Sequence, residues 1–134
     1  MKKDIPDNKV SGVTVAIANK EENGETLWYA YLLNNNGFPI DNVLITSKGY
    51  GKREGEQVKT SVTRQMFEKI EAETAAMIEP IDPALFALNN EYWVSYYIGK
   101  EIFDKRFVFV PETVKQENMS AIKLLDGMQG VLHD

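Results

Sequence analysis

The chain has 134 residues, which is enough for one domain with a single hydrophobic core and too few for two ordinary domains. It contains 15 basic and 20 acidic residues, and the net charge of -5 disfavours nucleic acid as a partner. Because there is no cysteine, thiol nucleophiles, disulfides and thiolate metal ligands are excluded. The single histidine, His133, stands next to the last residue, where chain ends are usually mobile. We therefore expect no enzymatic activity, no cofactor and no metal site.

The first nine residues form a polar N-terminal segment rather than an export signal. Asp4, Pro6 and Asp7 stand where a signal peptide needs its apolar region. The longest apolar stretch, residues 13–18, is far shorter than the roughly 20 residues that cross a bilayer. These features predict a cytoplasmic protein with no membrane partner.

Alternating apolar residues dominate the chain and predict β-strands separated by turns rich in Gly, Asn, Asp and Pro. In chain order, the alternation begins at Val13 and Ile17 and continues through residues 25–34, 40–50, 58–66 and 70–78. Within and directly after the last of these runs, the period of two predicts that Glu71, Glu73 and Glu79 face water. A glutamate there is read as part of a solvated strand face, not as a catalytic carboxylate.

Residues 91–110 form the clearest predicted hairpin, because Gly99-Lys100 matches a two-residue type II′ loop with Gly first. This loop fixes the register of the two strands, so that Tyr96 lies opposite Phe103 and Trp93 opposite Arg106. One face of the hairpin then carries the predicted core aromatics Tyr92, Tyr96, Phe103, Phe107 and Phe109.

About seven strands without a long helical pattern predict an all-β, antiparallel, immunoglobulin-like β-sandwich over residues 10–110. A small barrel is the alternative. After Pro111 the apolar residues fit neither period, which predicts an irregular C-terminal tail over residues 111–134. The tail is expected to pack on the domain or on a partner, including a second copy in a homodimer. We expect it to cover the Trp93 face of its own domain, since an intramolecular contact avoids the entropy cost of association.

The second face of the hairpin is a candidate interaction surface. It carries Trp93, Tyr97, Ile102 and Arg106, a mixture of aromatic, aliphatic and charged side chains that is typical of protein interfaces. Burial of this face under the tail is the alternative. A platform for sugars or single-stranded bases is a further one, although the negative net charge argues against bases.

Four sequence blocks resemble a known family. They are Leu-Leu-Asn-Asn at 32–35, Asn-Val-Leu-Ile-Thr-Ser-Lys-Gly-Tyr at 42–50, Ala-Leu-Asn-Asn-Glu-Tyr at 87–92 and Gly-Val-Leu at 130–132. In this order they resemble a family of small bacterial proteins that often carry the label phenylalanyl-tRNA synthetase subunit alpha. No segment matches the arginine-containing ATP motifs of such a synthetase, so no catalytic residue is carried over. Residues 34–50 are also similar to immunoglobulin-like accessory domains of bacterial proteins.

Three functions follow as expectations. The first is a non-enzymatic protein-interaction or accessory module of the bacterial cytoplasm, whose partner is another protein or a second copy of this chain. The second, implied by the family resemblance, is a factor associated with phenylalanyl-tRNA synthetase. The third is a carbohydrate-binding β-sandwich, for which the exposed aromatic face would supply the stacking surface.

Overall fold

The alternating runs form ten β-strands, which the computed structural model describes together with their connections over residues 9–133. The first group of strands comprises β1 (Val13–Glu22), β2 (Glu25–Asn34), β6 (Thr74–Pro80), β9 (Ser120–Ile122) and β10 (Met128–His133). The second group comprises β3 (Ile40–Arg53), β4 (Glu56–Lys59), β5 (Thr63–Ile70), β7 (Asn89–Ile98) and β8 (Glu101–Phe109). Three short 3₁₀ helices complete the fold, η1 (Pro83–Ala87), η2 (Gln116–Asn118) and η3 (Lys123–Leu125). Between residues 9 and 133, no helix is long and apolar enough to cross a membrane.

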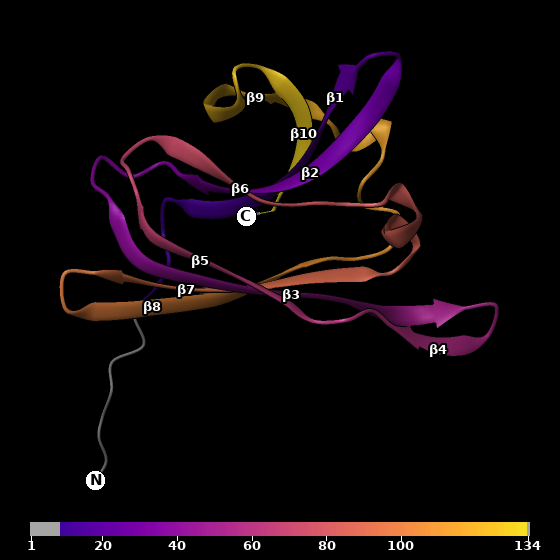
Figure 1. Ribbon diagram of the computed structural model, residues 1–134, viewed down its shortest axis with the longest axis horizontal. Coiled ribbons are helices and arrows are strands. Elements are labelled where there is room, and N and C mark those ends of the chain that lie inside the picture. The colour runs from indigo at the N-terminus through magenta and orange to yellow at the C-terminus, as the bar shows by residue number, and fades with distance from the viewer. Residues whose placement is uncertain (1–8, 134) are drawn as a thin grey trace, which may run out of the picture.

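The strands build two antiparallel sheets that lie one over the other in a sandwich-like arrangement (Figure 1). Sheet A has the strand order β6-β2-β1-β10-β9. Sheet B has the order β4-β3-β7-β8, and β5 also pairs with β3. The long strand β3 therefore pairs with β5 along its first half and with β4 along its second half. The all-β antiparallel fold expected from the alternation is confirmed. Residues 10–110 hold eight strands where about seven were predicted, and the described part of the tail adds two more.

The predicted register of the β7–β8 hairpin is confirmed. Tyr96 pairs with Phe103 and Trp93 with Arg106 on either side of the Gly99-Lys100 loop. The φ of Gly99 is +62°, in the left-handed region that favours glycine, as the loop requires. Four of the five predicted core aromatics, Tyr92, Tyr96, Phe107 and Phe109, are at most 2% exposed. Phe103 is half-buried and stacks on Tyr96.

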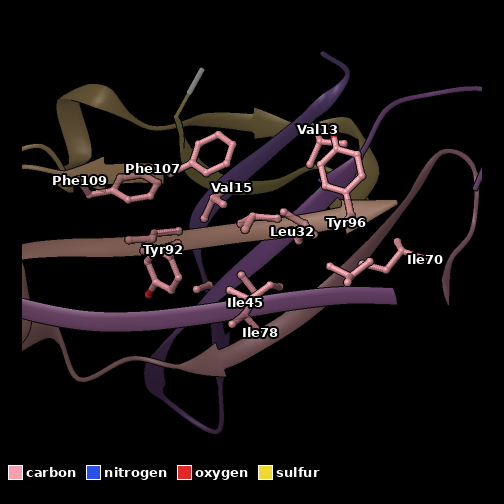
Figure 2. Packing of buried hydrophobic residues seen from close by; sticks show 14 of the residues in the cluster. Val13, Val15, Leu32, Ile45, Ile70, Ile78, Tyr92, Tyr96, Phe107 and Phe109 are labelled. Carbon is pink, nitrogen blue, oxygen red and sulfur yellow. The ribbon is translucent and has the colours of Figure 1, made fainter. Parts of the chain in front are cut away.

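The main core lies between the two sheets, where these aromatic rings meet aliphatic side chains of sheet A (Figure 2). Val15 and Leu32 from sheet A and Ile45 from sheet B are among the buried residues that fill this space. Burial of a full aromatic or branched aliphatic side chain contributes about 1.5–3 kcal/mol. The interleaved inner faces of the sheets are therefore the main source of stability.

The predicted run over residues 70–78 is interrupted, because β5 ends at Ile70 and β6 begins at Thr74. The chain crosses from sheet B to sheet A in this turn, where Glu73 has a φ of +52°. A side chain distant in sequence fixes the turn: the buried Asn34 amide donates to the carbonyl oxygens of Ile70 (3.2 Å) and Glu71 (3.1 Å). Periodicity alone cannot reveal such a contact.

The prediction of an irregular C-terminal tail over the Trp93 face was wrong on both points. The segment forms β9 and β10, and β10 pairs with β1, with Val131 opposite Ile17. The tail thus packs on its own domain, but it covers the outer face of sheet A. There Ala16 and Ala18 leave room for Ile122 and Leu125, with which they form a second buried cluster.

Gly130 permits this close approach of the tail to sheet A. A Cβ at position 130 would lie 2.7 Å from Ile122 Cδ1, 2.8 Å from Ala18 Cβ and 2.9 Å from the Ile17 carbonyl oxygen. The outer face of sheet B carries larger side chains, and its Trp93 remains 45% exposed. The small residues of β1 therefore explain why the tail packs on sheet A.

Candidate functional site

The four predicted surface residues lie together on the outer face of sheet B. Trp93 and Tyr97 come from β7, and their register partners Arg106 and Ile102 come from β8. Trp93 is 45%, Ile102 44% and Tyr97 36% exposed. The alternation and the hairpin loop were sufficient to place all four residues on one face.

Two further apolar residues, which the sequence analysis missed, extend this face toward the other edge of the sheet. Leu44 of β3 pairs with Ser95 of β7 on one side and with Met66 of β5 on the other. Leu44 is 36% and Met66 71% exposed. We refer to Leu44, Met66, Trp93, Tyr97 and Ile102 as the apolar patch. The β3–β5 pairing gave no sequence signal, because no short loop of fixed geometry joins these strands.

A groove adjoins the apolar patch at the Arg106 end of the sheet face. Its volume is about 410 Å³, and the charged side chains that line it are Lys48, Lys59, Glu91 and Arg106. Only 9% of the Glu91 side chain is exposed, and its carboxylate lies 3.7 Å from Lys48 Nζ and 3.8 Å from an Arg106 guanidinium nitrogen. Three cations thus line the groove with one carboxylate. We call this site the basic groove.

Tyr50 completes the contacts of Glu91. Its hydroxyl donates a hydrogen bond of 3.2 Å to Glu91 Oε1. Burial raises the pKa of Tyr50, and the hydrogen bond and charge of Glu91 raise it further. Tyr50 therefore remains a neutral donor, and the groove keeps its excess of positive charge.

A second site lies between the sheets, around Glu79 of β6. Thr63 Oγ1 donates to Glu79 Oε1 (2.9 Å), and the Tyr92 hydroxyl donates to Glu79 Oε2 (3.2 Å). Ser47 Oγ lies 3.1 Å from both carboxylate oxygens and also hydrogen-bonds Thr63 Oγ1. These four residues line a half-open cavity of about 170 Å³. We call it the Glu79 cavity.

The prediction that Glu79 faces water was wrong, whereas Glu71 and Glu73 are exposed as predicted. A β-bulge explains the difference. Met77 pairs with Tyr31, and Glu79, two positions further along β6, pairs with Ala30, which is directly adjacent to Tyr31 in β2. The extra residue, Ile78, shifts the alternation, so that Glu79 points to the same inner side as Ala30. Strict periodicity carries no information about such an insertion.

Burial, the charge of Glu79 and the hydrogen bond to it together raise the pKa of Tyr92 far above its ordinary value. Tyr92 is therefore a hydrogen-bond donor at neutral pH and not a general base. No imidazole lies beside either site: the only histidine, His133, contacts the rings of Phe107 and Phe109 instead. Among residues 9–133, no group of three or more histidine, aspartate or glutamate side chains is placed to hold a metal ion. The polar and charged groups of both sites can form hydrogen bonds and ion pairs.

Comparison of the chain with protein-family models, with curated proteins and with solved structures found no match. The function is therefore inferred from the geometry and chemistry of the two sites.

Proposed function

We propose that the protein is a non-enzymatic accessory module of the bacterial cytoplasm that binds a partner protein through the outer face of sheet B. The observation that carries this proposal is the apolar patch of five exposed side chains beside the basic groove. Exposed apolar side chains that gather on one face, bordered by charged groups, are typical of docking surfaces. Trp, Tyr and Arg, all present here, are the residues that most often dominate binding energy.

The charge of the groove indicates the chemistry of the partner. The whole chain has a net charge of -5, yet Lys48, Lys59 and Arg106 line a groove with the single carboxylate of Glu91. Such local positive charge favours acidic side chains and steers them to this end of the face. The partner segment therefore carries apolar side chains for the patch and Asp or Glu for the groove.

The connectivity supports an immunoglobulin-like reading of the fold, which we propose as its finer class. Strands β1, β2 and β6 follow the pattern of an A-B-E sheet, and β4 or β5, β3, β7 and β8 follow that of a C′-C-F-G sheet. In this reading β10 and β9 are additions beside the first strand. Fold alone does not specify the partner, so the proposal depends on the surface chemistry.

Two alternatives stay open for the same face. The resemblance to the family labelled phenylalanyl-tRNA synthetase subunit alpha makes a synthetase subunit the first partner to test. Trp93, 45% exposed beside Ser95 and Asp104 of the hairpin, also favours a sugar ligand, because sugar rings stack on such indoles.

The test compares variants of the face with a control on the opposite sheet. Trp93→Ala and Arg106→Glu change the proposed surface, and Met77→Ala removes a side chain of sheet A that is 49% exposed. Partners that co-purify from native lysate with the wild-type protein are identified by mass spectrometry, and the affinity of each purified partner is then measured by calorimetry. We expect both face variants to weaken binding by about 30-fold or more, as at an interface hot spot, and Met77→Ala to leave it unchanged.

The salt dependence gives a second expectation, since the groove should make the association rate fall as ionic strength rises. Equal affinity of all four proteins for the partner would overturn the proposal. If no protein partner is found, and the wild-type protein but not Trp93→Ala binds glycans on an array, the carbohydrate-binding function would replace this proposal.

A further inference from the structure

The geometry of the Glu79 cavity points to a binding site for a primary ammonium group carried on a short aliphatic stem. This inference is independent of the proposed function, because it concerns the space between the sheets and not the outer face of sheet B. It depends on the hydrogen-bond inventory of the cavity, on the charge of Glu79 and on the apolar residues of the lining.

The hydrogen-bond inventory shows what kind of ligand the polar side of the cavity accepts. Each of the three hydroxyl groups, on Ser47, Thr63 and Tyr92, has one proton to donate. Thr63 and Tyr92 donate their protons to Glu79. Ser47 donates either to Glu79 or to Thr63. In each arrangement the three protons are used within the cluster, and the lone pairs that are left over accept hydrogen bonds. A ligand that binds to the three hydroxyls and the Glu79 carboxylate must therefore bring donors.

The charge of Glu79 makes a cationic donor preferable to a neutral one. Among residues 9–133, no lysine, arginine or histidine lies within ion-pair distance of its carboxylate. Lys48, adjacent to Ser47 in β3, points to the other face of sheet B, where it contacts Glu91. In the part of the chain that the structure describes, the carboxylate is satisfied by hydroxyl groups alone, and a bound cation would add a charge-assisted hydrogen bond.

The cavity has an apolar wall and an opening that fit an aliphatic stem. Pro80, Ile81 and Leu85 line it together with the polar cluster. Gly49 contributes no side chain, and a Cβ there would meet Thr60 Cγ2 at 3.0 Å. The volume of about 170 Å³ suits a small alkylammonium or the end of a lysine side chain.

The bulge is an independent indication that the inward orientation of Glu79 has a functional role. Without it, the alternation of β6 would turn this side chain to the outer side of sheet A. Bulges are over-represented next to functional sites, where they redirect a side chain. The same hydrogen bonds would form if Glu79 served only to connect the two sheets. The experiment must therefore distinguish ligand binding from this structural role.

The test uses three four-carbon probes with a cationic, a neutral and an anionic head group: n-butylammonium, butan-1-ol and butyrate. Backbone amide shifts of the ¹⁵N-labelled wild-type protein are followed while each probe is added up to about 100 mM, the range of weak small-ligand binding. We expect saturable shifts for n-butylammonium at Ser47, Gly49 and Thr63, and none of comparable size for the other two probes. Equal shifts for butan-1-ol, or no shift at these residues with n-butylammonium, would overturn the inference.

A charge-matched pair of variants locates the site. Glu79→Gln keeps the shape of the side chain and removes its charge, and Glu73→Gln does the same at an exposed position in the preceding turn. Glu79→Gln should weaken n-butylammonium binding by about tenfold or more, as for loss of a charge-assisted hydrogen bond, while Glu73→Gln leaves it unchanged. Unchanged binding to Glu79→Gln would refute the site. Should this variant not fold, the three-probe comparison on the wild-type protein decides alone. Shifts at the same residues with calcium chloride but not with n-butylammonium would overturn the ammonium site and indicate a metal-ion site instead.

Discussion

Substitutions at two neighbouring positions of β10 test whether the C-terminal segment is a strand of sheet A. Val131 is 5% exposed and belongs to the core between the sheets, whereas Leu132 is 44% exposed on the other side of the strand. Val131→Ala removes two buried carbon atoms, worth about 1.6 kcal/mol of transfer free energy. A residual cavity of about 40 Å³ adds about 1 kcal/mol. The free energy of unfolding should therefore fall by about 2–3 kcal/mol.

Leu132→Ala is the matched control, because it truncates an adjacent residue of the same strand. Its side chain is half in solvent and leaves no enclosed cavity, so the loss should be about 1 kcal/mol or less. Urea denaturation followed by tryptophan fluorescence and circular dichroism gives both values. In a thermal scan, Val131→Ala should lower Tm by about 6–12 °C, since about 3–4 °C corresponds to 1 kcal/mol for a chain of this length.

Two results would refute this reasoning. If Val131→Ala stays within about 0.5 kcal/mol of the wild-type protein, β10 does not pack on the core. If Leu132→Ala is the more destabilising of the two, the β1–β10 register is displaced by one residue, which exchanges the two faces of the strand.

Three further predictions concern the hairpin, the tail and the buried tyrosine. Phe107→Ala should cost about 3–5 kcal/mol and Trp93→Ala clearly less, because only the first residue is fully buried; the reverse order in urea denaturation would contradict the β7–β8 register. Gly130→Ala should destabilise by about 1–3 kcal/mol, since the added methyl meets the Ile17 carbonyl oxygen, whereas Gly37→Ala, with open space around it, should be neutral or slightly stabilising; equal Tm values would show that the tail does not approach β1. Burial raises the pKa of Tyr96 to about 12, so its contribution to stability is complete below the unfolded-state pKa of about 10 and is lost as pH rises toward 12. Tyr96→Phe should reduce this alkaline loss in denaturation curves recorded between these pH values, and an unchanged pH profile would argue against burial of the hydroxyl.

The hairpin face was predictable from the sequence because local rules determine it. The Gly99-Lys100 loop fixes the register, and the period of two then assigns each side chain of β7 and β8 to a face. Trp93, Tyr97, Ile102 and Arg106 could therefore be placed together without knowledge of the rest of the fold. The same logic assigned four of the five predicted core aromatics correctly, and Phe103 is half-buried.

The tail was not predictable in this way, because its structure depends on residues more than a hundred positions away. β10 pairs with β1, and the closeness of that packing depends on Ala18 and Gly130 together. Each residue alone is unremarkable in the sequence. Only the long-range pairing explains why position 130 is a glycine, because the neighbouring strand leaves no room there for a Cβ.

The Glu79 cavity and the basic groove were missed for a related reason, since both arise where the alternation fails. The bulge at Ile78 turns Glu79 inward. The strand pairing also stops between β4 and β5, at residues 60–62, where the Thr60 side-chain hydroxyl accepts a hydrogen bond from the Gly49 amide. Both irregularities lie beside the same short stretch of β3, where Ser47 faces the cavity and Lys48 faces the groove. Where every residue obeys the pattern, an inner face is filled by apolar side chains and an outer face by solvated ones. A bulge or a strand break is one way in which a sheet places a polar group beside an interior space, so positions of this kind are the first to substitute when a ligand is sought.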